Sequence, residues 1–256
     1  MKVLAIGDVC GLPGVDFLCA ELPALRRELG ADLTVVNGEN ATGRGISPEL
    51  ADSIFYADAD VITLGNHAFH NRKIFDYLDE RAHIIRPGNL PSQLPGVGHT
   101  VLECGGRRVC VANLMGRLNM DFRLSDPFAA ADRLLREQDA DVYIFDFHAE
   151  ATSEKNAFGY FLAGRASAVF GTHTHVQTAD ERVLRGYTGY ITDLGMTGGA
   201  DSVIGVIPEH SVEYFRGAQT LRFESSESDL CICGALFELD AGGACLSVTR
   251  IRHEKN

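Results

Sequence analysis

Residues 168–175 read AVFGTHTH: a short apolar run, Ala168-Val169-Phe170, then a glycine, and then two histidines, His173 and His175, two positions apart. A short apolar run bounded by a glycine is typical of a buried strand. Side chains that follow the strands of an α/β sheet meet at its carboxyl edge, where ligands commonly bind. The segment therefore predicts a buried strand that ends in two imidazoles able to ligate a metal ion.

Four other segments repeat this arrangement, in which a side chain able to bind a metal follows an apolar run. They are Gly7-Asp8, Gly38-Glu39-Asn40, Gly65-Asn66-His67 and Phe147-His148. Each alone has an ordinary explanation, such as an Asn-Gly turn, a nucleotide-binding glycine loop or a surface histidine. Five such strand ends in one chain instead favour a shared metal site.

The residue types at these strand ends indicate the chemistry. A carboxylate at Glu39 can bridge two metal ions, while Asn40 and Asn66 offer neutral carbonyl oxygens. Carboxylate, amide and imidazole donors without a thiolate suit Mn²⁺ or iron. Two such ions stabilise the attacking and the leaving oxygen of a phosphoryl displacement. His67 is placed to protonate the leaving oxygen as a general acid.

The rest of the pattern predicts one α/β domain over residues 1–256. Apolar runs alternate with helical periodicity, which is typical of a sheet flanked by helices. Strands are expected at 2–7, 32–37, 60–65, 83–86, 141–147 and 167–172, and helices at 13–29, 47–57, 71–80, 127–138 and 153–164. Beyond Val176 strands are expected at 182–185, 189–193, 220–223, 230–238 and 244–251, with a short helix near 209–216. This order predicts two sheets packed face to face with helices outside.

Residues 88–120 interrupt the alternation. They contain Pro91 and Pro95, followed by a hairpin-like pair of runs, His99–Cys104 and Arg107–Asn113. The glycines between these runs are typical of a tight turn. The segment is therefore interpreted as a small cap inserted into the domain.

Length and composition limit the class of protein. The chain has 256 residues, of which 45% are hydrophobic, as expected for a globular domain with a sizeable core. No apolar run approaches the roughly 18 residues that a membrane span needs, and no secretion signal precedes the first strand. The seven scattered cysteines fit reduced thiols, and Cys231-x-Cys233 lies in an apolar run that favours core packing over chelation. These features predict a cytoplasmic protein.

The charge balance limits the partners. A formal net charge of −12 and a pI near 5.1 predict repulsion of long nucleic acids. Two bound metal ions would still attract a small phosphate, so a small phosphodiester or nucleotide is the expected substrate. A homo-oligomer is left open, because no residue specifies an interface.

With these residues in this order, the chain resembles the calcineurin-like metallophosphoesterase superfamily, whose general pattern is D-x-H, GD-x-x-D, GNH-D/E, a single His and G-H-x-H. Its segments also resemble the bacterial YmdB-like branch, whose members act as 2′,3′-cyclic-nucleotide phosphodiesterases. These segments are GDVCG, VNGENATGRGIS, TLGNHAF, DFHAEATSEK, GTHTHVQTADERVL and YITDLGMTGG, and they extend from Gly7 to about Gly205. Three features depart from the general pattern. Cys10 stands where a histidine is usual, Glu39 with Asn40 replaces the bridging aspartate, and a threonine stands beside His173 in Gly-Thr-His-Thr-His.

The resemblance implies a four-layer αββα sandwich with the site at the carboxyl ends of the strands. It implies that one metal ion is held by Asp8, Glu39, Asn40 and His175, and that a second is held by Glu39, Asn66, His148 and His173. The resulting hypothesis is hydrolysis of a small phosphodiester, such as a 2′,3′-cyclic nucleotide, by a hydroxide that bridges two Mn or Fe ions. A phosphomonoesterase or protein phosphatase, and a non-catalytic nucleotide-binding regulator, remain open as alternatives.

Overall fold

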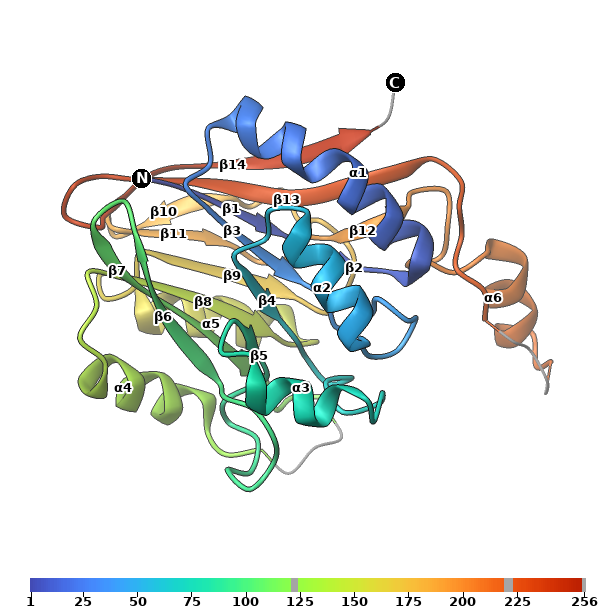
Figure 1. The fold of residues 1–256 in the computed structure, drawn as a ribbon, viewed down its shortest axis with the longest axis horizontal. Helices are drawn as coiled ribbons and strands as arrows, with labels where there is room; N and C mark the ends of the chain where they lie inside the picture. Colours follow the sequence, from blue (N-terminus) through green and yellow to red (C-terminus); the bar gives the residue numbers. More distant parts are fainter. Residues whose placement is uncertain (121–123, 219–222, 255–256) are drawn as a thin grey trace.

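The computed structural model describes residues 1–120, 124–218 and 223–254, and their strands form two sheets (Figure 1). The eight-stranded sheet has the order β2 (Asp8–Val9), β12 (Met196–Gly199), β13 (Leu230–Leu239), β1 (Lys2–Ile6), β3 (Leu33–Asn37), β4 (Val61–Thr63) and β5 (Ile84–Ile85), with β14 (Cys245–Glu254) paired to β13. The six-stranded sheet has the order β10 (Arg182–Leu184), β11 (Thr188–Ile191), β9 (Ala168–Thr172), β8 (Val142–His148), β7 (Arg107–Met115) and β6 (His99–Cys104). Both sheets mix parallel and antiparallel pairs.

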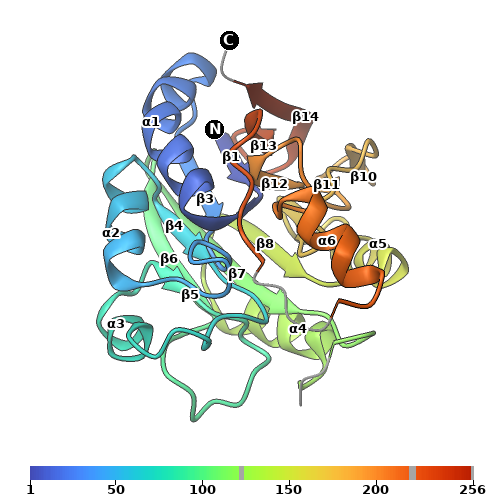
Figure 2. The same ribbon diagram turned by 90° about the vertical axis from the view of Figure 1, so that its right-hand side faces the viewer.

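Helices cover the outer face of each sheet (Figure 2). The eight-stranded sheet packs against α1 (Gly11–Leu29), α2 (Pro48–Tyr56) and α3 (Ile74–Glu80). The six-stranded sheet packs against α4 (Pro127–Glu137) and α5 (Thr152–Leu162). A sixth helix, α6 (Pro208–Phe215), projects from the side of the molecule in Figure 1. Within the described ranges, no helix combines the length and apolarity needed to cross a bilayer.

Strand β1 shows why the chain forms these layers. Its side chains alternate: Leu4 and Ile6 join the core beneath the helices, whereas Val3 and Ala5 join the core between the two sheets. A strand buried on both faces needs a continuous apolar run, and successive side chains point to opposite faces. The segment Val3–Ile6 meets both requirements, with every residue fully buried.

The predicted four-layer αββα sandwich is confirmed, although β2 and β12 were not expected. One expectation was wrong: the hairpin at 99–113 does not form a separate cap. It forms β6 and β7, and β7 pairs with β8, so the hairpin is part of the six-stranded sheet. The reason is that β7 is apolar enough to be buried over Val109–Met115. The strand expected at 220–223 falls on residues 220–222, which lie outside the described ranges, and Phe223, which is in no strand.

The topology brings the predicted site residues to one edge. Strands β1, β3 and β4 are parallel neighbours in one sheet, and β8 and β9 are parallel neighbours in the other. The loops that follow them therefore leave the sheets on one side of the sandwich. These loops contain the glycine-flanked segments that the sequence singled out.

Candidate metal centre

All seven predicted metal ligands lie in one connected cluster. His148 is its hub and is fully buried at the end of β8. Its Nε2 atom lies 3.2 Å from Oε1 of Glu39, 2.8 Å from Oδ1 of Asn66 and 3.1 Å from Nδ1 of His173. Ligands about 2.1 Å from one metal ion and at right angles to each other are about 3 Å apart. The spacing around His148 is therefore that of donors to a common ion.

A second group of donors also contacts Oε1 of Glu39. The amide nitrogen of Asn40 is 3.1 Å from Oε1 of Glu39 and 3.1 Å from Nε2 of His175. The same His175 atom lies 4.0 Å from Oδ1 of Asp8. Glu39 thus belongs to both groups, which is the position that a bridging carboxylate requires.

Hydrogen bonds orient His148 for metal binding. Thr172 donates its hydroxyl to Oδ1 of the buried Asp146 at 2.7 Å, so its oxygen accepts from Nδ1–H of His148 at 2.9 Å. A proton on Nδ1 leaves the lone pair of Nε2 free to point at the other donors. Such outer hydrogen bonds fix the tautomer and the ring orientation of metal-ligating histidines.

The other two histidines are oriented in the same way. Nε2 of His173 lies 3.1 Å from Oε2 of Glu150, which leaves Nδ1 to face the cluster. Nδ1 of His175 lies 3.0 Å from the carbonyl oxygen of Ile204, which leaves Nε2 to face Asn40 and Asp8. In its neutral form, each imidazole therefore directs one unprotonated nitrogen to the centre.

Two further features fit bound metal ions. Oδ1 of Asp8 is buried and has no hydrogen-bond partner among the described residues, a costly state for a carboxylate unless a cation pairs with it. A Cβ atom added at Gly65 would collide with Oε2 of Glu39 and Nε2 of His148. The glycine therefore keeps open the space between these two donors, and the donor set fits a metal site.

The loop that holds His173 and His175 is conformationally strained. Both residues have positive φ angles, 101° for His173 and 65° for His175, which residues other than glycine rarely adopt. A buried ion pair stabilises this loop: Nζ of Lys155 lies 2.6 Å from Oδ2 of Asp193. The same carboxylate oxygen accepts hydrogen bonds from the backbone and the hydroxyl of Thr174.

His67 lies beside the cluster rather than within it. Its Nδ1 is 2.7 Å from Oδ1 of Asn40, and its side chain is 24% exposed, so the ring is accessible from solvent. Turning the Asn40 amide over exchanges the positions of its oxygen and nitrogen. The oxygen would then face His175, as a metal ligand requires.

The charges of the cluster shift several pKa values. Burial raises the pKa of Asp8 to about 6, although His175 and His148 oppose the shift. Burial acts in the same direction on Glu39, but the neighbouring imidazoles, His148 first, outweigh it and lower its pKa to about 2. Burial, followed in size by the charge of His148, lowers the pKa of His173 to about 3. Burial disfavours the charged form of His148, but Glu39 outweighs that effect and raises its pKa.

These shifts predict that protons compete with the metal. Asp8 must be ionised to bind a cation, and its raised pKa means that the metal-free protein keeps this proton up to about pH 6. We therefore expect the Mn²⁺ affinity to fall as the pH drops below about 6, with a slope that approaches tenfold per pH unit for this one proton. Calorimetric Mn²⁺ titrations between pH 5.5 and 8 measure this dependence. An affinity that stays constant over this range would contradict the assignment of Asp8.

Several residues of the site had no assigned role in the sequence analysis. Asp146 is the one carboxylate inside the apolar run Val142–Phe147, which is a signal that the pattern contained. Cys10 is buried with its sulfur 3.4 Å from Nδ1 of His175, so it packs against a predicted ligand. No local pattern marks Glu150 or Lys155, because their partners are distant in the sequence.

The chain is similar to known proteins over nearly its whole length. The model of the YmdB-like protein family matches residues 4–251. The 2′,3′-cyclic-nucleotide 2′-phosphodiesterase of Bacillus subtilis is 43% identical over 94% of this chain and 92% of that protein. The crystal structure of a phosphatase from Mycoplasma pneumoniae is 34% identical, with a TM-score of 0.93 over 99% of this chain and 93% of that one.

A more distant structure supports the fold alone. A putative 5′-nucleotidase from Staphylococcus aureus is 15% identical, with a TM-score of 0.62 over 98% of this chain and 53% of that one. The family model and the Bacillus subtilis relative, in contrast, each match nearly the whole of this chain. This chain therefore belongs to the YmdB-like protein family.

Proposed function

We propose that this chain is a metal-dependent phosphodiesterase that hydrolyses 2′,3′-cyclic nucleotides. The main support is the position of Glu39, which joins two groups of donor atoms in one buried cluster. The printed activity of the Bacillus subtilis relative supports the choice of substrate. Free cysteines at all seven positions support a reducing compartment, the cytoplasm.

The donor groups suggest two ligand sets. Asp8, Asn40 and His175 would hold one ion, Asn66, His148 and His173 would hold the other, and Glu39 would bridge them. Neither set contains a thiolate, which favours Mn²⁺ or iron. When bound, the two ions would supply charge stabilisation for the phosphate and an activated water. The protein would contribute the orientation of each donor, through Thr172, Glu150 and the carbonyl of Ile204.

His67 would deliver a proton to the leaving oxygen. Its ring borders the cluster and is accessible, with Nδ1 beside the Asn40 side chain and Nε2 free to face a substrate. Burial lowers its pKa, although Glu39 opposes the shift. A lowered pKa makes the protonated ring a stronger acid toward a departing alkoxide.

Replacing His67 by asparagine is therefore expected to lower kcat for 2′,3′-cyclic AMP by about 10²–10⁴-fold, the usual contribution of a general acid. Metal content should be unchanged, because His67 is not assigned as a ligand. A p-nitrophenyl diester should lose much less activity, since its leaving group departs without a proton. Steady-state rates on both substrates, with metal analysis of the same samples, measure this difference.

His70 provides the matched control. It is exposed and its ring packs edge-on against His67, with centroids 4.7 Å apart, but it contacts none of the proposed ligands in the described structure. His70→Asn should retain nearly full activity on both substrates. Equal losses on both substrates in His67→Asn would refute a role in protonating the leaving group.

The proposal is tested by comparing ester classes. Initial rates for 2′,3′-cyclic AMP and for its monoester products, measured with Mn²⁺-loaded protein, should favour the cyclic diester. A strong preference for the monoester would instead identify a phosphomonoesterase.

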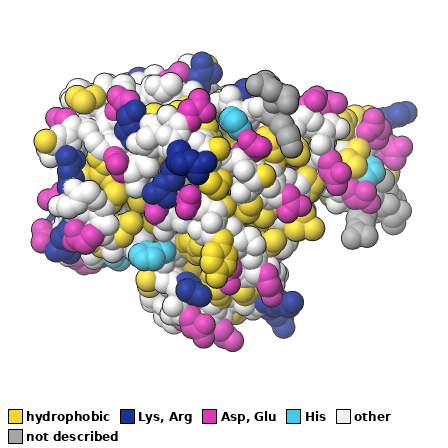
Figure 3. Space-filling view, turned by 45° about the horizontal axis from the view of Figure 1, so that its top comes forward, with side chains coloured by type: hydrophobic (Ala, Val, Ile, Leu, Met, Phe, Trp, Pro, Cys, Tyr) yellow, Lys and Arg dark blue, Asp and Glu magenta, His cyan; other side chains and the backbone are white. Residues whose placement is uncertain are grey.

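The surface is consistent with a small substrate: on the face in Figure 3, acidic and basic side chains are interspersed without a continuous basic band.

A further inference from the structure

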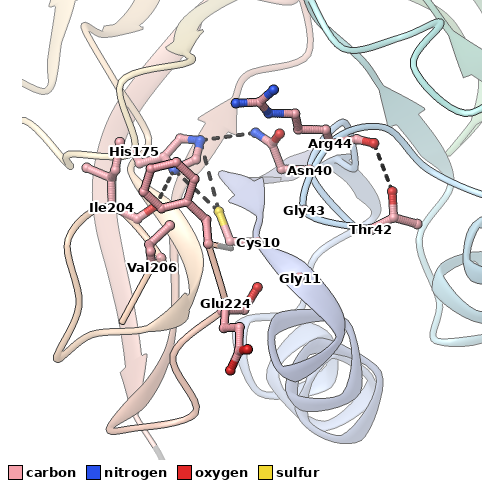
Figure 4. Close-up of a pocket in the computed structure, with 13 residues that line it drawn as sticks. Cys10, Gly11, Asn40, Thr42, Gly43, Arg44, His175, Ile204, Val206 and Glu224 are labelled. Carbon is pink, nitrogen blue, oxygen red and sulfur yellow. Dashed lines mark hydrogen bonds between the residues drawn. The ribbon is translucent and has the colours of Figure 1, made fainter. Parts of the chain in front are cut away.

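A cavity of about 550 Å³ opens beside the metal centre, and the proposed chemistry does not require it. Cys10, Asn40 and His175 line its inner end (Figure 4). Its volume lies within the roughly 300–1,000 Å³ of typical small-molecule sites and exceeds what a phosphate alone would fill. A substrate whose phosphate lies at the cluster would therefore extend its remaining part into this cavity.

The walls of the cavity differ in character. On one side lie Thr42, Gly43 and Arg44, from the loop that follows β3, and on the other lie Ile204 and Val206 (Figure 4). Phe223 also lines the cavity. Ile204 and Phe223 are 53% and 42% exposed, so large apolar surfaces border a polar centre. An aromatic ring and an arginine in one cavity are the groups on which nucleobases stack.

The apolar wall is tied to the metal centre. The carbonyl oxygen of Ile204 accepts the hydrogen bond from Nδ1 of His175 at 3.0 Å. Backbone pairing between Val206 and Ser225, and a hydrogen bond from Ser226 N–H to the Gly205 carbonyl at 2.9 Å, join the segments 203–206 and 223–226. The wall therefore has a fixed position relative to the proposed ligand His175.

We propose that this cavity is a nucleobase subsite and that Phe223 is its stacking residue. The inference rests on the function proposed above. It adds that the nucleobase of the substrate increases the affinity of the protein for a cyclic phosphate. Stacking on an aromatic side chain does not depend on the identity of the base, so purines and pyrimidines should both bind. Phe223 would act on binding and not on the reacting atoms.

The test compares 2′,3′-cyclic AMP with methyl riboside 2′,3′-cyclic phosphate, which has the same reacting group and no base. Phe223→Ala should raise KM for the nucleotide about 5–100-fold, the loss expected for one stacked base. Its kcat, and both parameters for the base-free substrate, should change less than about twofold. Phe215→Ala is the matched control. Like Phe223, Phe215 has its ring beside that of Tyr214. Phe215 is 81% exposed, however, and does not line the cavity.

Binding provides a readout that is independent of turnover. Calorimetry on Mn²⁺-loaded protein should show that adenosine 3′-monophosphate binds more tightly than ribose 3-phosphate, and that Phe223→Ala removes this difference. If no substrate is turned over but this binding pattern is found, the subsite stands and the proposed hydrolysis fails. Unchanged parameters in Phe223→Ala, or equal losses with and without a base, would overturn the subsite while leaving the hydrolysis intact.

Discussion

Glu39→Gln is expected to lower kcat/KM for 2′,3′-cyclic AMP by about 10³-fold or more and to reduce the Mn²⁺ content of the protein. The substitution keeps the shape of the side chain but removes the charge from a carboxylate that is 1% exposed. That charge lies between Nε2 of His148 and the amide of Asn40, and so contributes to both proposed ion sites. Metal ions contribute several kcal/mol to transition-state stabilisation, and a loss of that size lowers a rate by several powers of ten.

Glu150→Gln is the matched control for this prediction. Glu150 contacts Nε2 of His173 at 3.1 Å and is 48% exposed, so it orients a proposed ligand without being one. Residues of this kind typically contribute about 10–100-fold in metal affinity or activity. We therefore expect a smaller loss than in Glu39→Gln, and one that excess Mn²⁺ partly restores. Full activity with two bound ions in Glu39→Gln would refute the bridging role.

Lys155→Met is expected to cause the largest loss of stability, about 3–5 kcal/mol, because it leaves the charge of Asp193 buried without its partner. The two side chains are 2% and 1% exposed, and their 2.6 Å contact is shielded from solvent. For a domain of this size the loss corresponds to a fall in Tm of about 10 °C, measurable by calorimetry. The strained loop that holds His173 and His175 should loosen, so metal affinity should also fall.

The double variant Lys155→Met/Asp193→Asn separates charge burial from packing. Thr174 donates its hydroxyl to Oδ2 of Asp193 at 2.7 Å, and Gly195 donates its backbone N–H to Oδ1 at 2.8 Å. Asparagine is neutral, but its single oxygen can accept only one of these two hydrogen bonds. The double variant should therefore regain part of the stability that Lys155→Met loses. If both variants are equally destabilised, packing rather than the unpaired charge is the cause.

Much of the fold could be predicted from the sequence because its strands are short apolar runs that end at glycines. The run Val3–Ile6 is buried on both faces, and such a run is distinguishable from a helix by its length and its bounds. The hairpin at 99–113 was misassigned, because whether a hairpin extends a sheet or stands apart depends on its partner strand. That partner is β8, where Val142 pairs with Val109 of β7, and helix α4 lies between the two strands in the sequence. The pairing is therefore not local, and no local pattern reveals it.

The positions of the candidate ligands could also be predicted, but their supporting contacts could not. His148, His173 and Glu39 each follow an apolar run, which is a local signal. The carboxylate of Glu150, by contrast, is recognisable only once His173 is placed beside it. Lys155 lies on α5 within an ordinary helical pattern, and its pairing with Asp193 depends on how α5 packs against β9 and the loop after β11. The spacing of apolar residues in a sequence indicates which side chains are buried. The Glu150–His173 and Lys155–Asp193 pairs depend instead on how distant segments pack together.

The most direct test of the proposed two-metal centre is the rate of 2′,3′-cyclic AMP hydrolysis as metal-free protein is titrated with Mn²⁺. The ligand sets that Glu39 joins predict no turnover without metal and a rate that reaches its maximum at two ions per chain. Turnover by the metal-free protein, or a maximum at a single ion per chain, would contradict the dinuclear centre.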